Sequence, residues 1–309
     1  MQEEFKKDIG DLFKLSVTKA SVFRDGSDNV VWNLETDSGK KYIARVSKRD
    51  MGDEISFEAE WLRYLKSKGL PVVPIVESKS GKGYGVLGDR RSVTVFEFIV
   101  GKHLPFDKNT KPNIKAVVSA AKTLALLHNA SRGQTTPSSR RRTIYTELER
   151  ALKNEGEIIE KITDGKEFVS ASRRYLALRD SSEPVLVHND YRVGNIMFNN
   201  NLDVLAILDF DWSCIGPAIK DVAHALAEWS FADGASAHWR DIYDIFLESY
   251  NEASGVKIYD DGRLREWVVF SCLSDTCTYI IDCLERGEIK SVNGSYMYKK
   301  FLYFQNHLE

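Results

Sequence analysis

The first hundred residues carry short apolar runs with strand-like alternation, separated by turn residues. Residues 30–34 and 41–46 flank the turn at 37–40 and predict a β-hairpin. Residues 71–76 and 92–99 predict two further strands, on either side of a glycine-rich turn. The pattern indicates a small, mostly antiparallel sheet.

Helical spacing accompanies this sheet and then dominates the chain. Apolar residues recur every three or four positions near the start, and Ile55, Leu62 and Leu65 lie on one predicted helical face together with Glu58. From about residue 112 the pattern is helical, interrupted by a β-rich segment at 184–212. From residue 112 onward, the predicted helices cover residues 112–128, 144–180, 219–232, 238–252, 261–285 and 296–307.

One polar segment, residues 131–142, separates two of these helices and contains four arginines. It includes Arg132, Arg140, Arg141 and Arg142. We expect an exposed connection, with phosphate binding as the alternative interpretation.

Composition narrows the class of protein. Of the 309 residues, 43% are hydrophobic and 28% charged, which is typical of a soluble globular protein. The formal net charge of -2 argues against a general nucleic-acid or anionic-membrane binder. We find no apolar stretch long enough to span a membrane and no signal peptide, and the four cysteines form no metal-binding pair. We therefore expect a cytoplasmic protein, as a monomer or homodimer, without nucleic-acid or membrane partners.

The β-rich segment brings together residues suited to phosphoryl transfer. His188, Asp190 and Asn195 follow one strand-like run in the pattern H-x-D-x-x-x-x-N, and Asp209 and Asp211 follow the next. Phosphoryl transfer needs a group that receives or orients the hydroxyl proton, and oxygen ligands that hold magnesium on the phosphates. Asp190 suits the first task, and Asn195 with Asp209 suits the second, because magnesium prefers hard oxygen donors.

These motifs resemble the aminoglycoside phosphotransferase and choline kinase-like superfamily. The stretch 188–195 looks like that family's catalytic loop, 208–211 like its metal-binding strand, and 216–223 like the segment that follows. Residues 57–62, 69–74 and 95–101 are similar to its N-terminal helix, turn and hinge. The resemblance implies an α+β, two-lobed, protein-kinase-like fold. We expect an N-lobe at 1–98 with a small antiparallel sheet and one helix, which binds nucleotide. A larger, mostly helical C-lobe at 99–309 would carry the catalytic loop, the magnesium site and acceptor binding.

The resemblance also implies roles in the C-lobe. Asp190 would be the catalytic base, and Asn195 and Asp209 the magnesium ligands. Asp211 would either assist the metal or make a structural hydrogen bond. Arg192 would lie near the transferred phosphate, unless it is ion-paired or faces solvent. His188 would anchor the loop structurally.

In the N-lobe, the resemblance assigns ATP binding to three places. Glu58 would orient a phosphate-binding cation, where this sequence offers Arg45 in place of the usual lysine; Lys41 and Lys48 are fallbacks. Gly26 and Ser27 lie in the turn that would cover the phosphates. The hinge backbone near Glu97 and Ile99 would bind adenine.

The expected activity is therefore transfer of phosphate from ATP, with Mg2+, to the hydroxyl of a small-molecule acceptor. Acceptors in the superfamily include aminoglycosides, amino alcohols, homoserine and sugars. A stress-response-type protein kinase and a non-catalytic nucleotide-binding module are the alternatives. We expect an amine-bearing acceptor, because the helices after residue 221 are rich in acidic residues. These are Glu228, Asp233, Asp275, Asp282 and Glu285.

Overall fold

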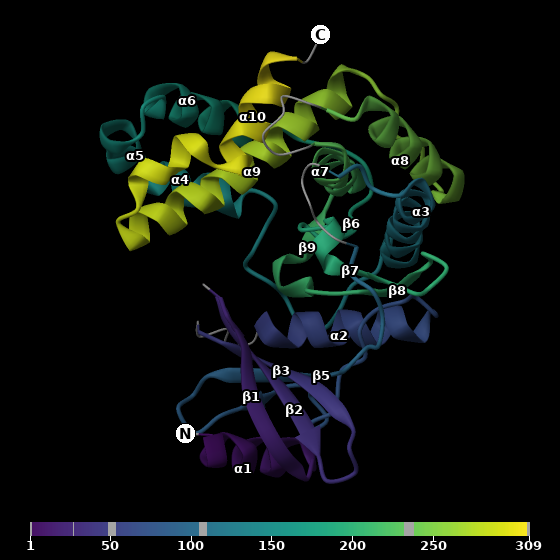
Figure 1. The fold of residues 1–309 in the computed structure, drawn as a ribbon. Coiled ribbons are helices and arrows are strands. Elements are labelled where there is room, and N and C mark those ends of the chain that lie inside the picture. Colours follow the sequence, from purple (N-terminus) through teal and green to yellow (C-terminus); the bar gives the residue numbers. More distant parts are fainter. Residues whose placement is uncertain (1, 27, 49–53, 105–109, 232–237, 308–309) are drawn as a thin grey trace. The chain divides into compact units, whose positions relative to one another are not determined.

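The computed structural model describes residues 2–26, 28–48, 54–104, 110–231 and 238–307 (Figure 1). Its contacts divide the chain into two compact units. The first contains residues 1–101, 135–141 and 206–208, and the second contains 102–134, 142–205 and 209–309. The architecture is α+β, with an antiparallel sheet in the first unit and a mainly helical second unit, in agreement with the predicted fold class.

The first unit is built on a five-stranded antiparallel sheet with the order β1-β2-β3-β5-β4. Its elements are α1 (Gln2–Phe13), β1 (Val17–Asp25), β2 (Asn29–Thr36), β3 (Lys41–Ser47), α2 (Glu54–Ser67), β4 (Gly85–Val86) and β5 (Ser92–Glu97). The predicted hairpin is confirmed: β2 pairs with β3 around a turn in which Gly39 takes a left-handed conformation, with φ 74°.

Strand alternation decides which face each side chain of β3 uses. Ala44 and Val46 point into the main core of the first unit, where they pack with Trp32 and with Phe5 and Ile9 of α1. Because successive strand residues point to opposite faces, Arg45 between them lies on the other face. That is the face on which it meets Glu58 of α2. The sheet thus separates the main core from the Arg45–Glu58 pair.

One strand prediction in this unit was wrong, and one strand was missed. Residues 71–76 form no named strand and make only isolated bridges, such as Ile75 with Phe96, because Pro71 and Pro74 lack the N–H that a ladder needs. The edge strand β1 was missed because most of its residues are exposed, so they lack the apolar alternation that marks a half-buried strand.

The second unit is mainly helical. Its helices are α3 (Ile114–Ser131), α4 (Thr146–Lys153), α5 (Glu155–Lys161), α6 (Gly165–Leu176), α7 (Ala218–Ser230), α8 (Arg240–Ala253), α9 (Gly262–Arg286) and α10 (Tyr296–Asn306). The short strands β6 (Val185–Val187) and β9 (Cys214–Gly216) pair with each other, and β7 (Ile196–Phe198) pairs with β8 (Val204–Ile207). The short 3-10 helices η1 (Val193–Asn195) and η2 (Phe210–Trp212) follow β6 and β8, and η3 (Ile289–Gly294) precedes α10.

The central helix of this unit is α7, because every one of its side chains is buried. It packs against α8 and α9, and it follows directly after β9. The helix predicted over 144–180 is three helices, α4 to α6, separated by short turns. Among the described residues, α9 has the length and hydropathy of a membrane span, but 72% of its most apolar stretch is buried inside the protein, as in a core helix.

Candidate active site

The candidate catalytic loop connects β6 to β7 and contains the predicted base. Asn195 donates from Nδ2 to the Asp190 carboxylate at 2.7 Å and to the Asp190 carbonyl at 2.9 Å. Arg192 donates from Nε to the same carboxylate at 3.1 Å. The structure therefore brings together Asp190, Arg192 and Asn195. Of the alternatives given for Arg192, it shows the ion pair, and the partner is Asp190.

The backbone of this loop is bonded by Asp221 of α7, a residue given no role in the sequence analysis. Its carboxylate accepts from the backbone N–H of His188 at 2.7 Å and of Asn189 at 2.8 Å. His128 of α3 also bonds Asp221, at 3.1 Å. Burial opposes the negative charge, but the His128 hydrogen bond and charge, together with Lys220, hold the pKa of Asp221 well below its usual range. Asp221 thus remains ionised and fixes the loop backbone.

Further buried contacts support the same loop. The hydroxyl of Tyr191 donates to the Ala120 carbonyl at 2.8 Å, and Trp229 Nε1 donates to the Tyr191 carbonyl at 3.2 Å. The ring of His188 is buried and lies 4.8 Å from the ring of Phe210, next to Asp209. These contacts agree with a structural role for His188.

Both candidate loops contain a non-glycine residue in a left-handed conformation. Asn189 has φ 66° and Asp209 has φ 62°. Asn and Asp tolerate this region better than most residues, but it still carries strain that the surroundings must offset. Asp209 is exposed and Asp211 is half-buried.

The donor set of this region fits a hard divalent cation. Because the amide nitrogen of Asn195 faces Asp190, its carbonyl oxygen is the atom that it could offer a metal. Asp209 adds an exposed carboxylate whose charge acts on both Asp190 and Arg192. Oxygen donors of this kind are what Mg2+ prefers.

Burial also changes the acidity of the candidate base. Desolvation raises the pKa of Asp190 above its ordinary value, and the charge of Asp209 adds to the rise. Arg192 and His224 partly oppose this by favouring the charged form. A carboxylate with a raised pKa is a stronger proton acceptor, as a general base requires.

In the first unit, Arg45 forms an ion pair with Glu58, the partner expected from sequence. Both side chains are largely buried, with exposed fractions of 11% and 4%. The Arg45 guanidinium also lies over the ring of Phe96, 5.2 Å from its centroid. Lys48 has other partners: its ammonium lies 2.5 Å from Asp25 and donates to the Gly26 carbonyl at 2.6 Å.

The remaining nucleotide predictions concern the turn and the hinge. Gly26 closes the β1–β2 turn by donating its N–H to the Asn29 carbonyl at 3.0 Å. Ser27 lies outside the described residues. The N–H of Glu97 donates to the Pro74 carbonyl at 2.9 Å, so adenine would have to bond other backbone groups of the hinge. Ile99 is half-buried.

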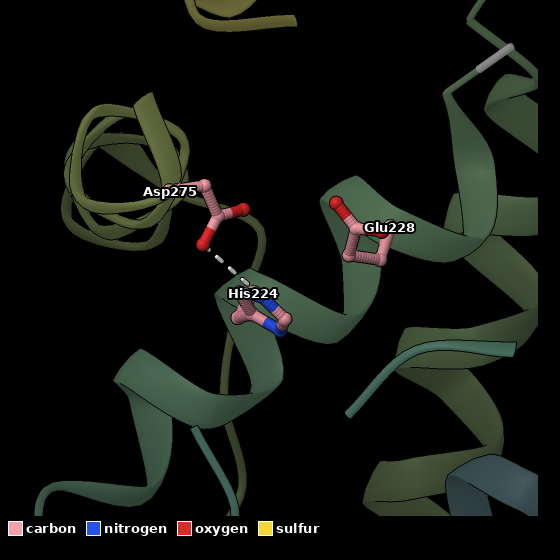
Figure 2. Close-up of side chains that lie close together, drawn as sticks. All are labelled: His224, Glu228 and Asp275. Carbon is pink, nitrogen blue, oxygen red and sulfur yellow. Dashed lines mark ion pairs between the residues drawn. The ribbon is translucent and has the colours of Figure 1, made fainter. Parts of the chain in front are cut away.

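A second polar cluster lies beside the catalytic loop. Figure 2 shows His224 and Glu228, one turn apart on α7, close to Asp275 of α9. Lys300 of α10 bonds both carboxylates, and its ammonium lies 2.8 Å from Asp275. His224 lies 3.4 Å from Asp275 through Nε2, while its buried Nδ1 has no hydrogen-bond partner among the described residues. Because Lys300 supplies the cation, a metal ion there would meet an existing positive charge.

The charged groups of this cluster shift one another's pKa. Burial opposes the charge of Lys300, but Asp275 and Glu228 outweigh it and raise the pKa of the ammonium well above its ordinary value. Burial likewise opposes ionisation of Asp275, but Lys300 and His224 hold the pKa of Asp275 well below its ordinary value. The cluster therefore contains two carboxylates for one ammonium. Sequence analysis named Glu228 and Asp275 but missed Lys300, whose partners lie far away in the sequence.

The other acidic residues predicted for the acceptor site do not join this cluster. Glu285 is exposed and lies 3.3 Å from Arg150, and Asp282 is half-buried on α9. Asp233 lies outside the described residues.

Comparison with known proteins identifies related chains and folds. The model of the phosphotransferase enzyme family matches residues 19–267. A homoserine kinase of Caulobacter vibrioides is 24% identical over 216 residues, which cover 68% of this chain and 66% of the relative, so the chain spans just under two thirds of that protein's length. A homoserine kinase of Bartonella tribocorum is 25% identical over 67% of this chain and 63% of its own length.

Solved structures share the fold. An amicoumacin kinase in complex with AMP-PNP, Ca2+ and Ami has a TM-score of 0.73 at 16% identity, covering 98% of this chain and 96% of its own. A choline kinase from Cryptosporidium parvum Iowa II has a TM-score of 0.66 at 14% identity, covering 95% of this chain and 90% of its own.

Proposed function

Since the chain belongs to the phosphotransferase enzyme family, we propose that it is a phosphotransferase that moves the γ-phosphate of ATP to a hydroxyl of a small molecule. The observation that carries this proposal is the bonding of Asn195 and Arg192 to the Asp190 carboxylate, within reach of the charge of Asp209. This set contains a proton acceptor, an arginine and oxygen donors for a metal, which are the parts that phosphoryl transfer uses.

In the proposed reaction, the acceptor hydroxyl oxygen bonds to the γ-phosphorus while the bond to the ADP oxygen breaks. Asp190 orients the hydroxyl and receives its proton. Arg192 favours the ionised form of Asp190 and would place a positive charge where the transferred phosphoryl group passes. Asn195 holds Asp190 in position and, with Asp209 and the assisting Asp211, would hold Mg2+, which neutralises charge on the phosphates when bound.

We assign nucleotide binding to residues of the N-lobe, taken as 1–98, and the chemistry to the C-lobe, taken as 99–309. Arg45, oriented by Glu58, would contact the phosphates through its planar fork. Gly26 and Ser27 would cover them, and the hinge backbone at Glu97 and Ile99 would hold adenine. A cytoplasmic location fits this use of ATP.

The acceptor proposed here carries an amine. Glu228 and Asp275 share the ammonium of Lys300, so whenever the His224 imidazole is neutral the cluster favours one further positive charge. Its charges also reach the catalytic loop, because Glu228 acts on Arg192 and His224 acts on Asp190. Asp275, with 21% of its side chain exposed, is the group of the cluster that an acceptor amine would contact. Homoserine, the substrate in the names of two relatives, is one such acceptor.

A screen for ADP release tests this function. We would supply ATP with and without Mg2+ and compare aminoglycosides, amino alcohols, homoserine and neutral sugars at two salt concentrations. Amine-bearing acceptors should give the highest turnover, which should fall as salt rises. A neutral sugar as best acceptor, with no salt effect, would contradict the acceptor class. Phosphorylation of generic protein substrates alone would favour the protein-kinase alternative.

A further inference from the structure

The arginine-containing segment at 131–142 is the one sequence feature that the proposed function does not use. Its central part, residues 135–141, belongs to the first unit, although the residues on either side belong to the second. We call residues 135–141 the strap. The exposed connection predicted from sequence is confirmed only in part: Arg141 is exposed, whereas the side chain of Arg140 is only 3% exposed.

The strap binds α2 at several points. Ser138 donates from its backbone N–H and its hydroxyl to the two carboxylate oxygens of Glu60, at 3.0 and 2.6 Å. Arg141 donates to Glu54 at 2.6 Å. Arg140 lies 4.0 Å from the Glu54 carboxylate, and its guanidinium is 5.5 Å from the centroid of the Phe57 ring.

Helix geometry shows what these contacts do to Glu58. An α-helix turns about 100° per residue, so Glu60 lies about 200° around α2 from Glu58, on nearly the opposite face. One face of α2 thus holds Glu58 against Arg45 of the sheet, while the strap holds Glu60 on the other face. Rotation of α2 that moved Glu58 away from Arg45 would have to break the bonds to Ser138.

We propose that the strap is a positioning element of the nucleotide site: Ser138 and Arg140 fix the rotation of α2 and thereby keep Glu58 on Arg45. The inference rests on the proposed function, because it gives the Arg45–Glu58 pair its task in binding ATP. Arg141 contributes little, since its side chain is 82% exposed and exposed ion pairs are weak. Ser138 and Arg140 carry the effect.

A double-mutant cycle on nucleotide affinity tests this inference. We would measure the Kd of a fluorescent ATP analogue for wild type, Glu60→Ala, Glu58→Gln and the double variant. Glu60→Ala should weaken binding about five- to tenfold in wild type and less than about twofold in the Glu58→Gln background, because the strap acts through Glu58. Arg140→Met should give the same pattern, and it replaces Glu60→Ala in the cycle if that variant folds poorly.

Arg63→Ala is the matched control. Arg63 also lies on α2, and its charge acts on Glu60, but its hydrogen bonds in the described part of the chain go to Glu77, at 2.7 and 2.5 Å, and to Gly81 rather than to the strap. Its removal should leave ATP affinity unchanged. Equal losses in both Glu58 backgrounds, or an equal loss from Arg63→Ala, would overturn the inference and leave the strap a role in stability alone. Wild-type protein that binds no ATP would instead remove the proposed function, and this inference with it.

Discussion

The two units hold their candidate functional groups in different ways. In the second unit, the backbone on the N-terminal side of Asp190 is bonded to buried Asp221. Tyr191, on its C-terminal side, forms hydrogen bonds with Ala120 of α3 and Trp229 of α7. In the first unit, Arg45 pairs with Glu58 and contacts the Phe96 ring. A buried network that bonds the loop backbone fixes one geometry, whereas a side-chain pair between a strand and a helix leaves more room for side-chain adjustment. Substitutions should therefore be severe near α7 and graded near β3.

The largest effect should come from Asp221→Ala. It leaves the N–H groups of His188 and Asn189 and the ring of His128 without their buried partner. Breaking a buried charged network typically costs about 3–5 kcal/mol. Urea unfolding should show a loss of that size, together with loss of turnover. Asp241→Ala, which removes an exposed ion pair with Lys111, is the control and should leave the urea midpoint unchanged. Equal midpoints for the two variants would show that Asp221 does not anchor the loop.

Removal of Asp209 should have the next largest effect, on metal use. In Asp209→Ala, ATP with Mg2+ should stabilise the protein no more than ATP alone. Asn195→Ala should keep part of the difference, because a neutral amide attracts the cation less than a carboxylate does. Thermal unfolding with ATP, with and without Mg2+, measures both. If Asp209→Ala retains the full magnesium-dependent shift in Tm, another residue holds the metal.

A smaller, graded effect is expected for Arg45→Lys. Lysine can keep one bond to Glu58 but cannot reproduce the planar fork or the contact of the guanidinium with Phe96. The KM for ATP should rise about three- to tenfold, with kcat changed less. Steady-state kinetics with varied ATP measures this. Complete inactivation would mean that the first unit is as intolerant as the second, and an unchanged KM would remove Arg45 from the nucleotide site.

The smallest effect on stability is expected for Asp190→Asn, and it depends on pH. The pKa of Asp190 is raised by burial, so in the folded protein the ionised form is disfavoured and costs stability at pH values above that pKa. Asp190→Asn removes this cost and should not lower the Tm at neutral pH. In wild type, turnover should fall as the pH drops through the raised pKa, because the protonated carboxyl cannot accept a proton. A Tm that falls clearly in Asp190→Asn at pH 7 but not at low pH would contradict the raised pKa.

Contiguous motifs made much of the candidate site visible in the sequence. Asp190, Arg192 and Asn195 lie within six residues, and Asp209 follows the next strand, so local spacing is enough to group them. Helical periodicity placed Glu58 on the apolar face of its helix, and the resemblance gave it the task of orienting a cation. The structure pairs Glu58 with Arg45.

The contacts that sequence analysis missed depend on long-range packing. Lys300 meets Glu228 from 72 residues away, and Ser138 meets Glu60 from 78 residues away. No periodicity or spacing within one segment predicts such pairs. For the strap, the polar, arginine-rich composition predicted exposure correctly for residues such as Arg141 but not for the side chain of Arg140, which lies against Phe57 and near Glu54.

Turnover of Asp190→Asn tests the central proposal most directly. ADP release with the best acceptor from the screen should fall by about 10²- to 10⁴-fold, the range typical of a lost general base, while the thermal shift produced by ATP with Mg2+ stays close to that of wild type. Turnover within tenfold of wild type would contradict the role of Asp190 and, with it, the proposed arrangement of the active site.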